Sequence, residues 1–130
     1  SPLRSDDLSP GMPMPSIRDL VEAIRTRDGV DAAVILGRDG LLIDSQVDAG
    51  VDAEAIAARI PSIVTPADDL GGALDRGALA TAVLEYDRGF AIVSVMSAEA
   101  ILLVLVRRNA DLGQLLHELR RHRGSIAALV

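Results

Sequence analysis

The feature that most constrains this chain is a block of three apolar segments in its second half, separated by only two short turns. The segments are residues 78–86, 90–96 and 100–107, and the turns are residues 87–89 and 97–99. A parallel crossover needs a dozen or more residues, so these turns predict antiparallel hairpins. The last segment is apolar on both of its faces, which predicts a central strand that is covered on both sides.

A helix and a hairpin are predicted before this block. Ser16 is a suitable helix cap, and the apolar residues that follow at helical spacing predict a helix that ends near Gly29. Residues 30–36 have the composition of a strand. The Asp39-Gly40 pair tolerates the positive φ of a tight turn, and residues 41–47 then form a return strand whose polar end suits a sheet edge.

A long apolar periodicity of helical type follows Asp52, a suitable helix cap, and stops at residues 75–77. Pro61 and Pro66 lie inside this pattern, and an interior proline costs a helix roughly 3 kcal/mol. Two alternatives therefore remain for this segment. It forms one kinked helix, or Pro61 opens a second helix after a short break and Pro66 bends it.

A last helix is predicted from a cap at Asn109 or Asp111 to Ile126. The predicted order is therefore αββαβββα, an α+β fold in which helices sandwich a five-stranded antiparallel sheet. We expect one domain over residues 16–130. Residues 1–15 are rich in Pro and Ser, and we expect them to be a disordered leader or a non-native addition.

The composition excludes several kinds of chemistry. All 13 basic residues are Arg, so mechanisms that need a lysine amine are excluded. The chain has no Cys and no Trp, which excludes thiol nucleophiles and Cys-ligated metals, and its net charge of −6 argues against nucleic-acid binding. The longest apolar run, residues 100–106, is too short to span a membrane, and no secretory signal is evident. We expect a cytoplasmic protein without a cofactor.

The polar residues form no catalytic constellation, so we expect no enzyme. His117 and His122 are five residues apart, not the three or four that place two ligands on one helix face, and they are predicted to be surface histidines. Asp68 and Asp69 are interpreted as solvated surface carboxylates. The Gly71-Gly72 pair is interpreted as a loosened helix end or a point of close packing.

Four arginines are candidate contacts for an anionic partner. They are Arg107 and Arg108 at the end of the last strand and Arg120 and Arg121 in the last helix, with Arg123 close by. Arginine is suited to such contacts because its guanidinium group binds carboxylates and phosphates in two-point fashion. The alternative interpretation is a charged rim that complements the helix dipole.

Two apolar features indicate that a partner docks on this chain. The middle helix is apolar over a wide arc, which suits a helix that is covered on two sides. The segment at residues 78–86 has no Lys or Pro that would protect it as a sheet edge. We therefore expect a dimer in preference to a monomer.

Three motifs, taken in order, resemble the Roadblock/dynein-light-chain superfamily over residues 16–129. They are GVDAAVIL at residues 29–36 with RDGL at residues 38–41, the Ala57-Ala58 pair, and NADLG at residues 109–113 with LLHELRR at residues 115–121. The resemblance implies two helices on one face of the sheet and the long helix on the other, which makes a three-layer sandwich. Pro61 and Pro66 depart from the uninterrupted middle helix of the family.

The resemblance also implies a function. Bacterial MglB-like members are homodimeric, non-catalytic regulators of a small Ras-like GTPase in cell polarity, and they dimerise through the middle helix and the third strand. On this chain the implied dimer interface consists of Ala57, Ile60, Val64, Ala67, Leu79, Thr81 and Val83. A second hypothesis is a small-ligand sensor module of the profilin-like type, which requires an apolar cavity of roughly a few hundred Å³ with converging polar groups.

Overall fold

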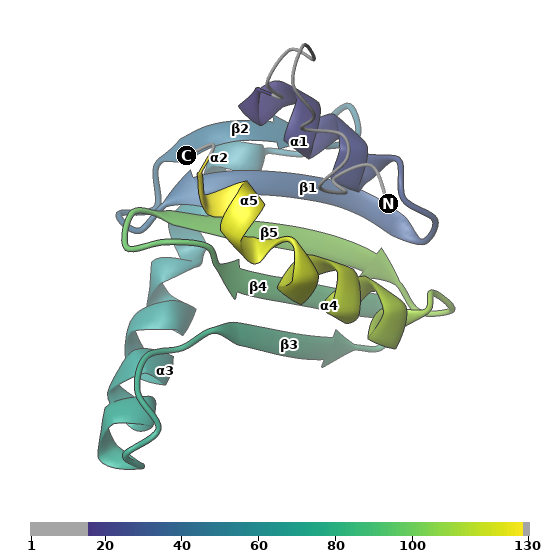
Figure 1. Ribbon diagram of the computed structural model, residues 1–130. Helices are drawn as coiled ribbons and strands as arrows, with labels where there is room; N and C mark the ends of the chain where they lie inside the picture. The colour runs from purple at the N-terminus through teal and green to yellow at the C-terminus, as the bar shows by residue number, and fades with distance from the viewer. Residues whose placement is uncertain (1–15, 129–130) are drawn as a thin grey trace, which may run out of the picture.

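The computed structural model describes residues 16–128, which form a five-stranded antiparallel sheet between helices (Figure 1). The spatial order of the strands is β2-β1-β5-β4-β3. The elements are α1 (Ile17–Arg25), β1 (Val30–Gly37), β2 (Leu42–Gln46), α2 (Ala53–Arg59), α3 (Pro61–Ala73), β3 (Thr81–Tyr86), β4 (Gly89–Val95), β5 (Ala100–Arg107), α4 (Leu112–Arg121) and α5 (Arg123–Ala127). The predicted α+β fold is confirmed. The predicted leader at residues 1–15 lies outside the described residues.

The helices lie in two layers on opposite faces of the sheet (Figure 1). Helices α1, α4 and α5 lie on one face and α2 lies on the other. Helix α3 continues from α2, and its far end extends beyond the sheet on the side of β3. This is the three-layer arrangement that the resemblance implied, with the long middle helix divided in two.

Strand β5 is the central strand, as predicted, and it contributes side chains to both faces of the sheet. Leu102 and Val104 pack with residues of α1 and α4, whereas Ile101 and Leu103 pack with residues of α2 and α3. All four side chains are buried. Because successive side chains of a strand point to opposite faces, an apolar run of this kind is stable only between two covering layers.

Two local sequence signals produce the expected local structure. The Ser16 hydroxyl accepts a hydrogen bond from the Asp19 amide, and the Asp19 carboxylate accepts one from the Ser16 amide, so the first turn of α1 is capped reciprocally. Gly40 has a φ of +87°, and a Cβ atom there would lie only 3.1 Å from Cγ of Pro61. Glycine therefore lets the β1–β2 turn lie against the junction of α2 and α3.

The middle helix is broken, and Pro61 opens its second half. Helix α2 ends at Arg59, Ile60 lies between the two helices, and Pro61 is the first residue of α3. A proline is tolerated at this position because the first amides of a helix have no partner within the helix. Pro66 lies inside α3. The structure thus has the break at Pro61 that the second of the two arrangements contained.

Two predicted elements have different bounds in the structure. The predicted strand at residues 78–86 begins only at Thr81, because the Leu79 amide donates to the Asp68 carboxylate of α3 at 2.7 Å and bends the chain there. The predicted last helix is divided at His122, whose backbone angles (φ −102°, ψ 8°) end α4 before α5 begins.

The Gly71-Gly72 pair allows a prediction with a built-in control. A Cβ atom at Gly71 would lie 2.2 Å from the carbonyl oxygen of Gly77, whereas a Cβ atom at Gly72 would meet no atom within 4 Å. Gly71 is therefore a point of close packing. Gly71→Ala should lower the free energy of unfolding by about 1–3 kcal/mol, and Gly72→Ala should raise it by up to about 1 kcal/mol through helix propensity. Urea unfolding of both variants measures the difference, and equal effects would contradict the close packing.

Candidate functional site

The most distinctive surface of the molecule is apolar and lies where α3 passes the edge of the sheet. Leu70 and Leu74 on α3 are 59% and 58% exposed, and Tyr86 at the end of β3 is equally open. Leu70 and Leu74 belong to the end of α3 that extends beyond the sheet (Figure 1), whereas Tyr86 is the last residue of the edge strand β3. We call Leu70, Leu74 and Tyr86 the α3–β3 surface.

A shallow apolar groove adjoins this surface. It has a volume of about 210 Å³, and its walls are α2 and the start of α3 on one side and strands β3, β4 and β5 on the other. Ile56 and Ile63 contribute from the helices, Leu84 and Leu105 from the strands, and Arg59 is the one charged residue that lines it. Its volume is below the usual range for a small-ligand site, and its lining lacks converging polar groups. The groove therefore suits a protein side chain better than a small ligand.

Strand β3 is an open edge of the sheet among the described residues. It pairs with β4 over Thr81–Tyr86, and no other described strand pairs with its outer side. It carries no Lys or Pro, which are the residues that commonly prevent edge-to-edge pairing. The edge is thus available for pairing with another strand.

The residues predicted for a dimer interface lie in three different environments. Ala57, Ile60 and Val64 are at most 5% exposed and pack against the sheet within one chain. Ala67 and Leu79 are half-buried. On the opposite face of β3, Thr81 accepts a hydrogen bond from Arg123 at 2.7 Å, and Val83 is exposed. The three buried residues therefore stabilise the packing of the helix on the sheet. Exposed apolar area comes from Val83 of the predicted set and from Leu70, Leu74 and Tyr86, which lie outside it.

Helical spacing gave an indication of two exposed residues that the predicted interface did not include. Leu70 and Leu74 continue the apolar stripe of Ile60, Ile63 and Ala67. The stripe indicates only that these residues share one side of the helix. The structure shows that the sheet covers the first half of the stripe and leaves the second half open.

Asp68 holds the base of α3 in place, and the interpretation of this residue as a solvated surface carboxylate was wrong. Its Oδ1 accepts the Leu79 amide at 2.7 Å, and its Oδ2 pairs with the Arg38 guanidinium at 2.6 Å. The amide hydrogen bond, followed by the bond to Arg38, holds the pKa of Asp68 below its usual value of 3.8. Asp68 thereby joins α3 to the β1–β2 turn and to the start of β3. Its neighbour Asp69 is exposed, as expected.

This contact predicts a dependence of stability on pH. Because the pKa of Asp68 is lowered by folding, the unfolded chain binds more protons than the folded chain between the lowered pKa and 3.8. The contribution of Asp68 is complete above this window and is lost as the pH falls through it. Asp68→Asn should flatten the fall in unfolding free energy as the pH falls below about 4, and Asp69→Asn, a change of the exposed neighbouring carboxylate, is the matched control. Denaturant titrations at a series of pH values test this, and parallel profiles for wild type and Asp68→Asn would contradict it.

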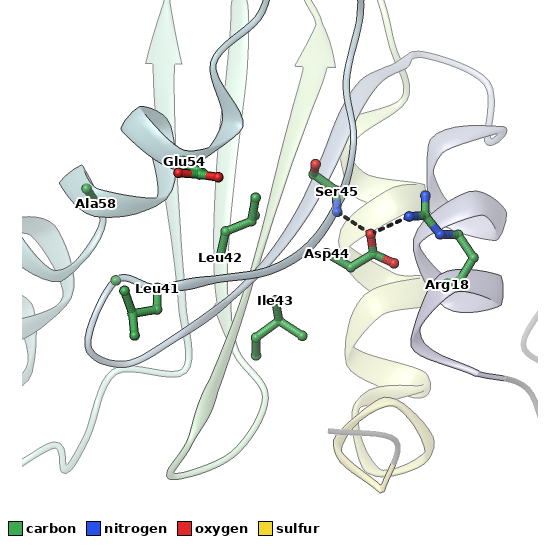
Figure 2. A pocket seen from close by; sticks show the side chains of 9 residues that line it. Arg18, Leu41, Leu42, Ile43, Asp44, Ser45, Glu54 and Ala58 are labelled. Atoms are coloured by element: carbon green, nitrogen blue, oxygen red, sulfur yellow. Dashed lines mark hydrogen bonds and ion pairs between the residues drawn. The ribbon is translucent and has the colours of Figure 1, made fainter.

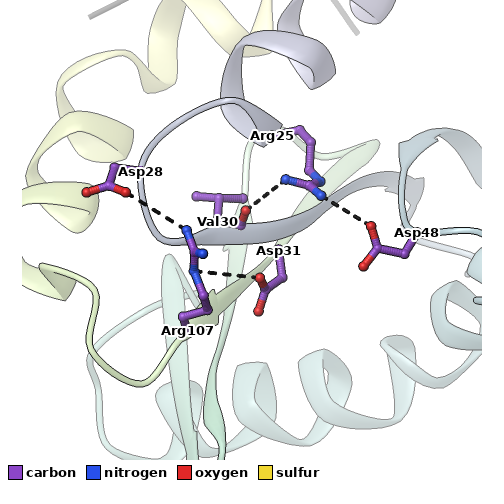
Figure 3. Close-up of polar contacts among 6 residues, drawn as sticks. All are labelled: Arg25, Asp28, Val30, Asp31, Asp48 and Arg107. Atoms are coloured by element: carbon purple, nitrogen blue, oxygen red, sulfur yellow. Dashed lines mark hydrogen bonds and ion pairs between the residues drawn. The ribbon is translucent and has the colours of Figure 1, made fainter.

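The four candidate arginines differ in how far they are already engaged. Arg107 lies between Asp28 and Asp31, with N–O distances of 3.9 and 3.8 Å (Figure 3). Arg108 pairs with Glu85 and donates a hydrogen bond to the Tyr86 carbonyl at 2.9 Å.

Arg120 and Arg121 are exposed on α4 and make no ion pair with any residue between 16 and 128. They are the pair that remains available to an anionic partner. Arg123 is already engaged, because it donates to Thr81 and also to the buried Ser94 at 3.2 Å.

The histidines do not form a metal site with other described residues, and one of them departs from expectation. His117 is exposed, as predicted. His122 is buried, because the chain turns at the end of α4 and directs its side chain inward, where Nε2 lies 3.6 Å from the Glu118 carboxylate. Burial lowers the pKa of His122 in spite of the opposing effect of Glu118. No group of three potential metal ligands occurs within residues 16–128.

The described part of the chain contains no helix of the length and apolarity that crossing a membrane requires.

Solved structures with a similar fold include Roadblock proteins. A Roadblock/LC7 domain from Streptomyces avermitilis matches with a TM-score of 0.77 and 23% identity, covering 87% of this chain and 96% of that one. The gliding protein MglB from Thermus thermophilus matches with a TM-score of 0.76 and 16% identity, covering 86% of each chain.

Sequence comparison extends this likeness. An uncharacterized protein of Methanocaldococcus jannaschii is 31% identical over 112 residues, which are 86% of this chain and 93% of that protein. The family model of the Roadblock/LC7 domain matches residues 17–106, a span that runs from α1 through β5. The chain therefore belongs to the Roadblock/LC7 domain family.

Proposed function

We propose that this chain is a homodimeric, non-catalytic regulator or scaffold of a small Ras-like GTPase and that it acts in the cytoplasm. The observation that carries the proposal is the α3–β3 surface, where large apolar side chains lie exposed beside an unpaired sheet edge. Large apolar side chains that are exposed in this way are typical of interaction sites in soluble domains. Membership of the Roadblock/LC7 family and structural likeness to MglB, a GTPase regulator, support the regulatory role.

The proposed dimer uses a second copy of the chain to cover this surface. The β3 edges pair across a two-fold axis, so that two sheets become one, and the overhanging ends of α3 lie against the partner. Leu70, Leu74 and Tyr86 form the contact together with Ala67 and Leu79. A two-fold axis suits this surface because it brings apolar residues opposite apolar residues.

The GTPase contact is proposed to include Arg120 and Arg121. These two residues are exposed and make no ion pair within residues 16–128, so their charge is available to acidic groups of a partner. They act as binding contacts and not as catalytic groups. The resemblance implies that the GTPase is regulated by reordering of its own residues, without an arginine supplied from outside.

The test of function is a nucleotide assay with the small Ras-like GTPases encoded in the same genome. Adding the purified chain should change the rate of GTP hydrolysis or nucleotide exchange of one of them by at least about tenfold. The double variant Arg120→Glu, Arg121→Glu should reduce the effect at subsaturating concentration, because it reverses the charge of the contact. Arg88→Glu, an exposed arginine in the β3–β4 turn, is the matched control. Absence of both binding and rate change for every such GTPase would refute the proposal.

A further inference from the structure

A second open surface lies at the opposite edge of the sheet, along β2. Here a hollow of about 660 Å³ is lined by residues of the β1–β2 turn, β2, α1 and α2. Leu41 and Ile43 are 69% and 46% exposed within it, and no described strand pairs with the outer side of β2. Gly40 and Ala58 also line the hollow. We call this hollow the β2 groove.

The two sides of the β2 groove differ in chemistry. Figure 2 shows Glu54 and Ala58 of α2 on one side of β2, with Leu42 directed toward them, whereas Ile43 is directed the other way. Glu54 makes no ion pair with any residue that the structure describes. One side of the edge thus carries an unpaired negative charge, and the other side carries exposed aliphatic surface.

Only a short part of the β2 edge is open. The Ser45 amide donates to Oδ1 of Asp44 at 2.8 Å, and the same oxygen pairs with Arg18 of α1 at 3.0 Å (Figure 2). This cluster covers the edge from residue 44 onward, as charged groups do at protected edges. At the other end, the Leu41 amide donates to Asp39 Oδ1 at 3.0 Å and the Leu41 carbonyl accepts the Gly37 amide at 2.9 Å. Only Leu42 and Ile43 therefore remain accessible to another backbone.

We propose that the β2 groove binds an extended segment of a partner protein in which apolar and basic residues alternate. Side chains of an extended segment point alternately to opposite sides, so one set covers Leu41 and Ile43 while the other faces Glu54. The backbone of the segment lies along the short open edge at Leu42 and Ile43, and the basic residue supplies the charge complementary to Glu54.

A second copy of this chain suits the groove less well. A two-fold contact would bring together two grooves whose unpaired charge is negative in both. Pairing of β2 with β2 would also need the part of the edge that Asp44 and Arg18 cover. The observations therefore favour a different partner with a short basic segment.

The test uses two synthetic octapeptides, one of alternating Val and Lys and one of alternating Val and Glu, added to the isotopically labelled chain. The Val-Lys peptide should shift the amide resonances of residues 40–45, 54 and 58, and the Val-Glu peptide should not. Glu54→Gln should raise the dissociation constant of the Val-Lys peptide at least fivefold. Asp87→Asn, which removes one negative charge at the opposite edge of the sheet, should leave the affinity unchanged.

Each of the other outcomes would overturn the proposal. Binding of both peptides or of neither would remove the charge preference, and shifts elsewhere would place the site on another surface. If the resonances of residues 41–45 shift with protein concentration in the absence of peptide, the occupant is a second copy. None of these results depends on a GTPase, so the β2 groove and the proposed function succeed or fail separately.

Discussion

Replacing Leu74 by Asp is expected to convert the proposed dimer into monomers, with a rise of at least about thirtyfold in its dissociation constant. Leu74 is exposed at the C-terminal end of α3 and belongs to the α3–β3 surface, and burying an unpaired carboxylate in the proposed contact costs about 2 kcal/mol or more. Sedimentation velocity over a concentration series measures the effect. Leu41→Asp is the matched control, because Leu41 is at least as exposed but lies at the other edge of the sheet.

The protomer itself should keep its stability in the Leu74→Asp variant. Leu74 is the C-cap of α3 and already faces solvent in the single chain, so the substitution opens no cavity. Circular dichroism and urea unfolding of the monomeric variant should therefore show a folded domain. A wild-type chain that remains monomeric at about 100 μM, well above the dissociation constants of stable dimers, would contradict the dimer outright.

The sequence predicted the elements of this fold because their signals are local. The cap at Ser16, the turn at Gly40 and the two-sided apolar run of β5 each depend on residues within a few positions of one another. The β3 boundary depends instead on the contact of Asp68 with Leu79, eleven residues away, and no periodicity reports such a contact.

The candidate site was predictable only in part for a related reason. Helical spacing places Ile60, Val64 and Leu74 on one side of the middle segment, but it contains no information on where the sheet ends. The sheet covers Ile60 and Val64 and leaves Leu74 open. The location of the candidate surface thus depends on the length of the sheet relative to the helix, which is a property of the folded molecule.

Leu103→Ala is expected to have the largest effect on folding, a loss of about 2–5 kcal/mol of unfolding free energy. Leu103 lies on the central strand, is 2% exposed, and packs with residues of α2 and α3, so its removal leaves a cavity that the sheet cannot close. Urea unfolding measures the loss. The experiment is best done in the monomeric Leu74→Asp background, where stability does not depend on protein concentration.

Leu105→Ala provides the comparison, because Leu105 lies two positions along the same strand and on the same face. It is only half-buried, since it lines the open groove beside β3. In the monomer, Leu105→Ala should lower the free energy of unfolding clearly less than Leu103→Ala does, because solvent already reaches the Leu105 side chain. If the second copy also covers the groove that adjoins the α3–β3 surface, the cost of Leu105→Ala should be larger in the dimer than in the monomer. An identical cost in both states would mean that the partner leaves the groove open, and the contact would then be confined to α3 and the β3 edge.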